Sequence, residues 1–362
     1  MTEFPTKWYM NDTRTIFGHK QHYPIIQHAI HISTIEKLIS CMQTGTRLII
    51  ACFAFAIVAY TFACDRGSDT VVVDFEKTVA VKRPMSPVPD SGRLNVAVAA
   101  MISPKETLIF YQQLLDYIGV KLGREMHLIQ RKTYGEINEL IGKGQIDLAF
   151  ICSGPYAAAK DKHGFEALVT PVVRGKPFYQ SYLIVNQGSP YRELEDLRGR
   201  TFALSDPDSN TGSLVPKFWL SQIGETVESF FKNVIYTYSH DNSILTVARS
   251  LVDGAAVDGH KWEYYNSRNP TYTSKTRVIK KSRLFGSPPL VASITMPDDQ
   301  KQRIRDVLYR MPDDADGQKI LEQLMIERFA APRDEWYEPI RAMYQGLSSK
   351  AGKIHAQAKP QN

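Results

Sequence analysis

The stretch TYGEINELIGKGQIDLAFICSGPYAAAKDK, residues 133–162, contains the alternation that decides the fold class. Residues 133–145 predict a helix, and Ile146–Ile151 predicts a fully buried strand. The segment CSGPYAAAKDK then opens another helix, with Ser153 or Gly154 at its cap. Strands that alternate with helices at this spacing favour a parallel sheet covered on both faces, so the stretch predicts an α/β fold.

The same alternation extends on both sides of this stretch. An apolar run of strand length at Arg93–Ala100 opens the folded body, and the segment after it predicts a helix capped by Ser103. A second unit begins near residue 181, where two strands flank a short helix and lead to a helix from Gly212. The chain after about residue 277 returns to the first unit. Two α/β lobes connected more than once are the architecture of a hinged clamp.

We therefore predict a two-lobed α/β protein in which each lobe is a mainly parallel sheet with flanking helices. The predicted segments are 1–41 as a start-site over-extension or disordered segment, 42–64 as a signal peptide or membrane anchor, 65–92 as a tether, 93–183 plus 278–346 as lobe I, 184–277 as lobe II, and 347–362 as a disordered tail.

The N-terminal part carries one large compositional anomaly. Leu48–Ala63 is uncharged and almost wholly apolar, short for a membrane-spanning helix but right for the apolar core of an export signal. Cys64 follows directly and resembles the lipidated cysteine of a bacterial lipobox. Met42 would provide a conventional start. An uncleaved anchor is the open alternative, and both interpretations place the rest of the chain outside the cytoplasmic membrane.

Composition narrows the functional classes. The 362 residues carry a formal net charge of +6 and no long basic run, so no nucleic-acid footprint is indicated. Cys152 is the one cysteine of the predicted body, which allows neither a disulfide framework nor a cysteine metal site. The sequence contains no P-loop, nucleophile elbow or H-E-x-x-H motif. We therefore expect no cofactor, no bound metal and no enzyme activity.

The stretch SDPDSNTGSLVPKFWL, residues 205–220, raises a functional question. Small and polar residues before an amphipathic helix are explained by simple helix capping. They also fit an anion site, because the free amides and the dipole of a helix start attract negative charge. At two further places, 99–106 and 149–157, a predicted strand also leads into a helix through a turn of small residues. Helix starts that converge on one cleft would surround a tetrahedral oxyanion with amides.

Four segments occur in order at spacings that make them recognisable: TYGEINELIGKGQIDLAFICSGPYAAA, GKPFYQSYLIVNQGSP, LRGRTFALSDPDSNTGSLVP and VDGAAVDGHKWEYY. They resemble the phosphate/phosphite/phosphonate-binding proteins of ABC importers, the PhnD family. The resemblance runs from about Arg93 to Gly346. It implies a type II periplasmic-binding-protein fold that closes on a phosphorus oxyanion.

The resemblance also implies which side chains contact the ligand. Ser209, Asn210 and Thr211 match the family's hydroxyl-rich triplet, although the family more often has a hydroxyl where Asn210 stands. Tyr134 and Tyr179 match aromatic positions that wall the pocket and provide phenol donors. Without the resemblance, both tyrosines would be interpreted as packing residues.

Four more residues complete the predicted site. His240 matches a family histidine that reaches the ligand oxygens, and Asp258 falls beside the family's acidic or amide position. A carboxylate there could accept a hydrogen bond from a protonated phosphorus acid and would repel sulfate. Ser153 and Gly154 open a helix whose amides face the predicted cleft. Helix capping is the open alternative for His240, Asp258 and Ser153.

One departure from the family bears on the ligand. A binder of aminoalkyl phosphonates needs carboxylates to pair with the amine, because a buried ammonium without a partner is costly. The corresponding positions here carry His260 and Pro288. This favours a small ligand such as phosphate, phosphite or methylphosphonate.

The combined expectation is a monomeric, extracytoplasmic receptor of an ABC importer, anchored through a lipidated Cys64 or an uncleaved N-terminal segment. It would capture a phosphorus oxyanion and present the closed form to a membrane permease. The alternative is a sensing subunit of the same fold that acts on a membrane signalling partner, which the fold cannot distinguish.

Overall fold

The computed structural model describes residues 92–99 and 104–357. The chain divides into two units, 1–82 and 83–362, and every described residue belongs to the second. The predicted signal, Cys64 and nearly all of the predicted tether lie outside the described residues. Within the described part, no helix combines the length and the apolar character needed to cross a membrane.

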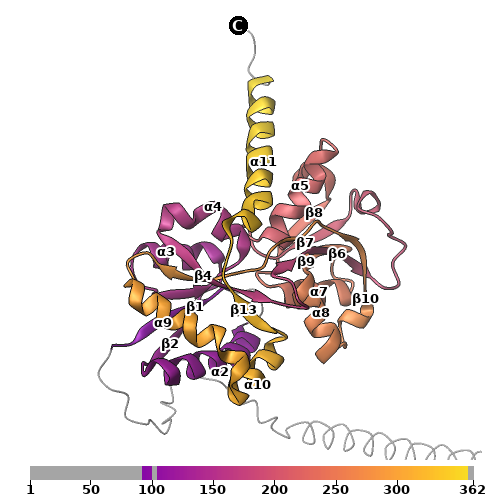
Figure 1. Ribbon diagram of the computed structural model, residues 1–362. Helices are drawn as coiled ribbons and strands as arrows, with labels where there is room; N and C mark the ends of the chain where they lie inside the picture. Colours follow the sequence, from indigo (N-terminus) through magenta and orange to yellow (C-terminus); the bar gives the residue numbers. More distant parts are fainter. Residues whose placement is uncertain (1–91, 100–103, 358–362) are drawn as a thin grey trace, which may run out of the picture. The chain divides into compact units, whose positions relative to one another are not determined.

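Lobe I is built on a six-stranded sheet with the order β13-β4-β12-β3-β1-β2 (Figure 1). Its strands are β1 (Leu94–Val98), β2 (Met126–Gln130), β3 (Leu148–Phe150), β4 (Phe165–Val172), β12 (Leu290–Ser293) and β13 (Arg328–Ala330). Its helices are α2 (Pro104–Leu122), α3 (Tyr134–Gly142), α4 (Ser153–His163), α9 (Asp298–Tyr309), α10 (Ala315–Leu324) and α11 (Glu338–Gln357), with the 3₁₀ turns η4 (Met311–Asp313) and η5 (Asp334–Tyr337). The helices α2, α9 and α10 lie on one side of the sheet and α3 and α4 on the other, which buries strands such as β3 on both faces.

Lobe II is built on a five-stranded sheet with the order β10-β6-β9-β7-β8. Its strands are β6 (Ser181–Asn186), β7 (Thr201–Leu204), β8 (Asn233–Tyr236), β9 (Gly254–Asp258) and β10 (Thr276–Lys281). Its helical segments are η1 (Glu195–Leu197), the π-helical turn η2 (Asn210–Leu214), α5 (Val215–Gln222), α6 (Val227–Phe230), α7 (His240–Ala248), α8 (Gly259–Arg268) and η3 (Thr273–Lys275). Alternate residues of β6 enter two different clusters, Leu183 and Val185 in one and Tyr182 and Ile184 in the other, because successive side chains of a strand point to opposite faces.

The prediction of mainly parallel sheets is wrong, because both sheets are mixed. In lobe I, β1 is parallel to β2 and β3, whereas β12 runs antiparallel between β3 and β4, and β13 is antiparallel to β4. In lobe II, β7 is parallel to β8 and β9, whereas β6 is antiparallel to β9 and β10. The strands β6 and β12, each the first strand after a crossing between lobes, run antiparallel to both of their neighbours, because no helical crossover precedes them to make them parallel.

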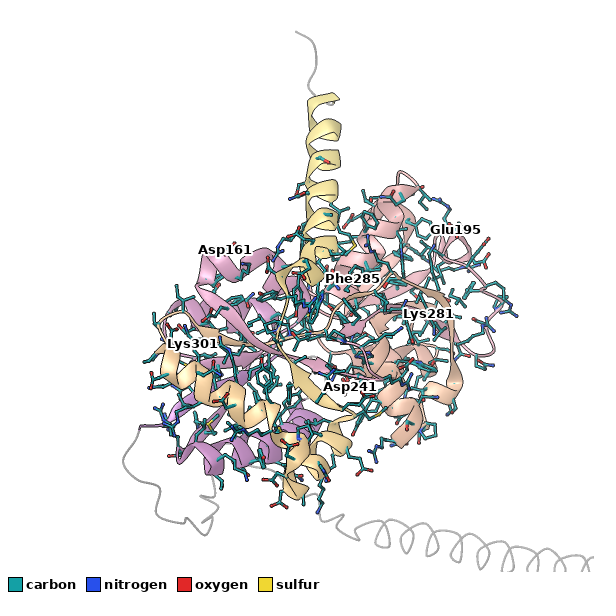
Figure 2. The ribbon with its side chains drawn as sticks, in the orientation of Figure 1. Asp161, Glu195, Asp241, Lys281, Phe285 and Lys301 are labelled. Carbon is teal, nitrogen blue, oxygen red and sulfur yellow. The ribbon has the colours of Figure 1, made fainter. Side chains whose placement is uncertain are left out.

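The two crossings pair with each other in a short two-stranded sheet. β5 (Phe178–Tyr179) lies on the way from lobe I to lobe II, and β11 (Phe285–Gly286) lies on the way back. Figure 2 shows Phe285 in the middle of the described unit, and only 1% of this residue is exposed. The two chain segments that connect the lobes therefore lie side by side, as a hinge requires.

The observed elements extend past three of the predicted boundaries. The lobe II sheet already includes Ser181 at the start of β6, and it still includes Lys281 at the end of β10, so the predicted limits 184 and 277 are too narrow. The predicted disordered tail from 347 begins inside α11, which continues to Gln357. Ser181 pairs with Asp258 and Lys281 pairs with Tyr182, so pairing across the sheet extends the strands past the predicted limits.

The lobe I core reaches into lobe II. Leu214 and Val215, at the junction of η2 and α5, belong to the same buried cluster as the lobe I residues Ile151 and Tyr156. Helix α11 packs against α4 of lobe I and α5 of lobe II. The two lobes are therefore in apolar contact beside the predicted site.

We predict that Leu114→Ala on α2 lowers the free energy of unfolding by about 2–5 kcal/mol, because Leu114 is 0% exposed and its removal leaves a cavity. Val120→Ala on the same helix should change it by less than about 0.5 kcal/mol, because Val120 is 81% exposed. Urea denaturation of both variants followed by circular dichroism measures the difference. Equal effects would mean that α2 does not pack on the sheet in this way.

Candidate functional site

Three helix starts meet where lobe I faces lobe II. They are Tyr134 at the start of α3, Ser153 at the start of α4, and Asn210 at the start of η2. The α4 and η2 starts were predicted to converge. The α3 start was not, and the third predicted turn, at 99–106, falls largely on residues 100–103, which the structure does not describe.

The start of η2 folds as its sequence predicts. Ser209 is the N-cap, and its hydroxyl accepts the Gly212 N–H at 3.0 Å. Capping consumes this acceptor, so the Ser209 side chain holds the turn in shape. Gly212 is required, since a Cβ there would lie 1.7 Å from the Ser205 Oγ.

Asp206 connects this turn to lobe I. Its Oδ2 accepts the Tyr134 N–H at 3.1 Å, and its Oδ1 accepts the Asp208 N–H at 2.8 Å. The side chain is 1% exposed, and burial raises its pKa to about 6, although both hydrogen bonds oppose this. Sequence analysis missed Asp206. The available signal was an acidic residue directly after strand β7, at the carboxyl edge where α/β proteins place functional groups.

The start of α4 lies against the backbone of the η2 turn. A Cβ on Gly154 would be 2.5 Å from the Asp208 carbonyl oxygen and 2.9 Å from the Asn210 nitrogen. Cys152 is the N-cap of α4, which corrects the prediction of Ser153 or Gly154 there. Burial raises the pKa of the Cys152 thiol to about 11, although the backbone N–H groups of Asn210 and Gly154 lower it, so the thiol stays protonated.

The Ser153 hydroxyl forms a hydrogen bond with the Tyr179 hydroxyl in the β5 crossing. The Asn210 Nδ2 donates to the same Tyr179 oxygen at 3.1 Å and to the Ser153 Oγ at 3.5 Å. Burial raises the pKa values of Tyr134 and Tyr179 well above their usual value, so both phenols keep their protons and are hydrogen-bond donors.

His240 approaches the same turn from the start of α7. Its Nδ1 accepts the Asp258 N–H at 3.1 Å, and its Cε1 would lie 3.1 Å from a Cβ on Gly212. Burial lowers the pKa of His240 to about 4, so the ring is neutral near pH 7 and carries its proton on Nε2. The alternative prediction for His240, a place at a helix start, is also observed, because Ser239 is the N-cap of α7.

Several buried polar atoms at this place have no hydrogen-bond partner among the described residues. They include Tyr134 Oη, Thr211 Oγ1 and Asn210 Oδ1, and the three residues are at most 1% exposed. Leaving a buried hydroxyl unpaired costs about 1–3 kcal/mol, so such a cluster indicates a ligand that pairs with it. We call Tyr134, Ser153, Tyr179, Asn210, Thr211 and His240 the interlobe site.

Asp258 differs from this group in position. The carboxylate of Asp258 caps α8 by accepting the Lys261 N–H at 3.2 Å, and it lines a separate cavity of about 70 Å³. His260 and Pro288, which stand where carboxylates were considered, line the same cavity. Gly154 belongs to the interlobe contact through its backbone, and Cys64 is outside the described residues.

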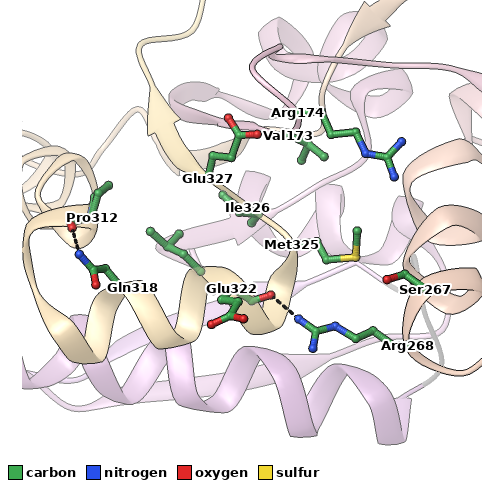
Figure 3. A pocket seen from close by; sticks show the side chains of 11 residues that line it. Val173, Arg174, Ser267, Arg268, Pro312, Gln318, Glu322, Met325, Ile326 and Glu327 are labelled. Carbon is green, nitrogen blue, oxygen red and sulfur yellow. Dashed lines mark hydrogen bonds between the residues drawn. The ribbon is translucent and has the colours of Figure 1, made fainter.

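A larger hollow lies between α8 and α10 (Figure 3). It measures about 660 Å³, and its lining includes Arg174, Arg268, Glu322 and Glu327. The Arg268 Nη2 of lobe II donates to the Glu322 carbonyl oxygen of lobe I at 2.8 Å across it. None of its described lining residues has a buried polar atom without a partner, so we place the candidate site at the smaller, polar interlobe position despite the larger volume here.

Comparison with known proteins identifies the family of the chain. The family model described as "ABC transporter, phosphonate, periplasmic substrate-binding protein" matches residues 96–337. The phosphonates-binding periplasmic protein of Escherichia coli is 26% identical over 269 residues, which cover 72% of this chain and 79% of the relative.

Solved structures give the same result for the fold. The binding-protein component of an ABC phosphonate transporter from Pseudomonas aeruginosa aligns with a TM-score of 0.67 and 26% identity, over 71% of this chain and 86% of that chain. A Prochlorococcus marinus protein solved with methylphosphonate aligns with a TM-score of 0.64 and 18% identity, over 71% and 98% of the two chains. The fold is that of a type II periplasmic binding protein.

We predict that Asp206→Asn changes how stability depends on pH. Because folding raises the pKa of Asp206 from 3.8 to about 6, the folded state holds this proton more tightly than the unfolded state. The stability contributed by the protonated form is therefore present at low pH and is lost as the pH rises from about 4 to about 6. The difference between the two pKa values corresponds to about 3 kcal/mol in the free energy of unfolding.

Urea unfolding of both chains between about pH 4 and pH 7.5 tests this, because the other titrating groups, His240 included, cancel in the difference. The wild-type chain should lose stability relative to the variant as the pH rises. A difference that does not change with pH would show that Asp206 titrates normally.

Proposed function

The chain belongs to the phosphonate-binding family of ABC-transporter periplasmic substrate-binding proteins, and we propose that its interlobe site captures a phosphorus oxyanion. The observation that carries this proposal is the set of buried, unpartnered polar atoms, Tyr134 Oη and Thr211 Oγ1 above all. A tetrahedral anion has acceptor oxygens in several directions, which is what converging hydroxyl and amide donors require.

Binding by this site uses neutral donors. Near pH 7 the phenols of Tyr134 and Tyr179 are protonated, because burial raises their pKa values. The ring of His240 is neutral and carries one proton, because burial lowers its pKa. Hydrogen bonds to an ionised acceptor are shorter and stronger than neutral ones, and exclusion of water between closed lobes strengthens them further. Asp206 is the nearby buried carboxyl, with a pKa of about 6, and its charge near pH 7 is held by hydrogen bonds from the Tyr134 and Asp208 backbone N–H groups.

Closure is the second half of the mechanism. Tyr134 and Ser153 come from lobe I, Asn210, Thr211 and His240 from lobe II, so the complete site exists only when the lobes meet. A ligand that contacts both lobes stabilises the closed form by its difference in affinity for the two forms. Capture by closure needs no covalent step, and the thiol at the site, Cys152, is held protonated by burial.

The membrane context completes the proposal. The family places the protein outside the cytoplasm and in an ABC transporter. We propose that the closed monomer is recognised by the membrane permease, and that Cys64 or the apolar segment before it anchors the chain to the membrane. Phosphate, phosphite and methylphosphonate are the first ligands to test.

We predict that Tyr134→Phe and Thr211→Val each weaken binding of the preferred phosphorus anion by at least about tenfold, because each removes a donor to a charged acceptor. Neither change should lower the stability of the unliganded protein, since the atom removed has no partner there. Isothermal titration calorimetry, after removal of bound ligand by partial unfolding, measures affinities for phosphate, phosphite, methylphosphonate and sulfate.

Tyr191→Phe is the matched control, because the Tyr191 hydroxyl donates to Asp253 within lobe II at 3.0 Å. Its affinity should equal that of the wild-type chain. Absence of binding heat for every phosphorus anion would refute the proposed function.

We predict that Gly154→Ala weakens ligand binding by about tenfold or more, because the new Cβ would overlap the Asp208 carbonyl oxygen in the closed form. Lobe I should keep its stability, since alanine favours helix more than glycine does. Gly135→Ala on α3 is the control, with its Cβ at an ordinary 3.4 Å from the Asp208 Oδ2. Small-angle scattering should show ligand-induced compaction in the control and not in Gly154→Ala; compaction in both would contradict the proposed closure.

A further inference from the structure

The cavity of about 70 Å³ adjoins the interlobe site and is lined from both lobes. Tyr111 and Ser287 contribute from lobe I, and Asp258, His260 and Lys261 from lobe II. Two contacts connect it to the site, the hydrogen bond from Asp258 N–H to His240 and a 6.1 Å separation between the rings of His260 and Tyr179. The cavity therefore lies next to the interlobe site, on the side of α8.

Lys261 supplies a positive charge to this cavity. Burial lowers its pKa, but Tyr111 and Asp258 raise it by more, so the ammonium stays charged. Among the described residues, no carboxylate forms an ion pair with Lys261. A ligand carboxylate in the cavity would supply the ion-pair partner that this ammonium lacks among the described residues.

The two carboxylates that line the cavity already have other partners. Asp258 accepts the backbone N–H of Lys261 as the cap of α8. Glu263 forms an ion pair with Arg174 at 2.7 Å and accepts a hydrogen bond from the Tyr182 hydroxyl. Asp258 is thus engaged as a helix cap and Glu263 in an ion pair, whereas Lys261 has no ion pair among the described residues.

A second donor lies on the lobe I side of the cavity. Ser287 is 0% exposed, and its Oγ has no hydrogen-bond partner among the described residues. Its backbone is fixed by two hydrogen bonds, from its own N–H to the Pro177 oxygen and from the Tyr337 hydroxyl to its carbonyl oxygen. The cavity thus presents an ammonium from one lobe and an unpaired hydroxyl from the other.

We propose that this cavity is a subsite for the substituent on phosphorus, and that Lys261 and Ser287 select a substituent ending in a carboxylate. The inference rests on the proposed function and narrows the ligand from any phosphorus oxyanion to a carboxylated phosphonate. A water molecule needs about 10–15 Å³ of such space, so 70 Å³ has room for about five non-hydrogen atoms. A carboxymethyl group fits this volume, and its carboxylate forms charge-assisted hydrogen bonds with Lys261. An ammonium at the same place would be repelled.

Titration of the full chain with phosphonoacetate, propylphosphonate and 2-aminoethylphosphonate tests the subsite, because the three share a head group and differ in the charge of a similar arm. Phosphonoacetate should bind at least about tenfold more tightly than propylphosphonate, as a charge-assisted pair allows, and 2-aminoethylphosphonate should bind most weakly. A ratio of one or less between the first two would overturn the subsite.

Lys261→Met should bring the ratio of the phosphonoacetate and propylphosphonate affinities close to one. Lys261→Arg should keep most of the preference for phosphonoacetate. Lys232→Met, on an exposed loop of lobe II, is the matched control and should leave the ratio unchanged. A preference that persists in Lys261→Met would also overturn the proposal. If phosphate or methylphosphonate binds but phosphonoacetate shows no preference, only the subsite fails; if no phosphorus anion binds, the proposed function fails with it.

Discussion

The close approach of two backbones at Gly154 is the constraint on which the site depends. The start of α4 comes so near to the Asp208–Asn210 backbone that a single methyl group would not fit. This approach brings the Asn210 side chain within hydrogen-bonding distance of Tyr179 and Ser153. The same close approach therefore brings the lobes into contact and positions the donors, and a residue larger than glycine at position 154 would disrupt both.

The electrostatics of the site follow from burial. Burial keeps protons on the phenols of Tyr134 and Tyr179, removes the charge of His240 near pH 7, and raises the pKa of Asp206. A pocket of neutral donors binds an anion through directional hydrogen bonds. It therefore binds only an anion whose oxygens lie where the donors point. The positive charge of Lys261 lies outside this group, in the neighbouring cavity, where it acts on the substituent and not on the head group.

Most of the fold could be predicted from local patterns. The buried runs at 94–98, 148–150, 181–186 and 201–204 are strands as predicted, and the helix after the first strand begins at Pro104. The helix predicted from Gly212 begins earlier, at Asn210, with Ser209 as its N-cap. The direction of strands was predicted less well. Apolar runs of β12 and β3 look alike in sequence, but the chain enters β12 from the other lobe, and only that path makes it antiparallel.

The sequence by itself determined the α/β class, the division into two lobes, and the small and hydroxyl-bearing residues available for an anion, because these depend on periodicity and on residue type within short segments. The tertiary structure alone decided that the α3 start joins the site through Asp206, that Ser153 bonds to Tyr179 and does not cap α4, and that Lys261 and Ser287 face one cavity. Tyr134 and Asp206 are 72 positions apart, and Lys261 and Ser287 come from different lobes. Contacts of this kind are made between segments far apart in the sequence, and no local pattern along the chain encodes which residues the tertiary fold will bring together.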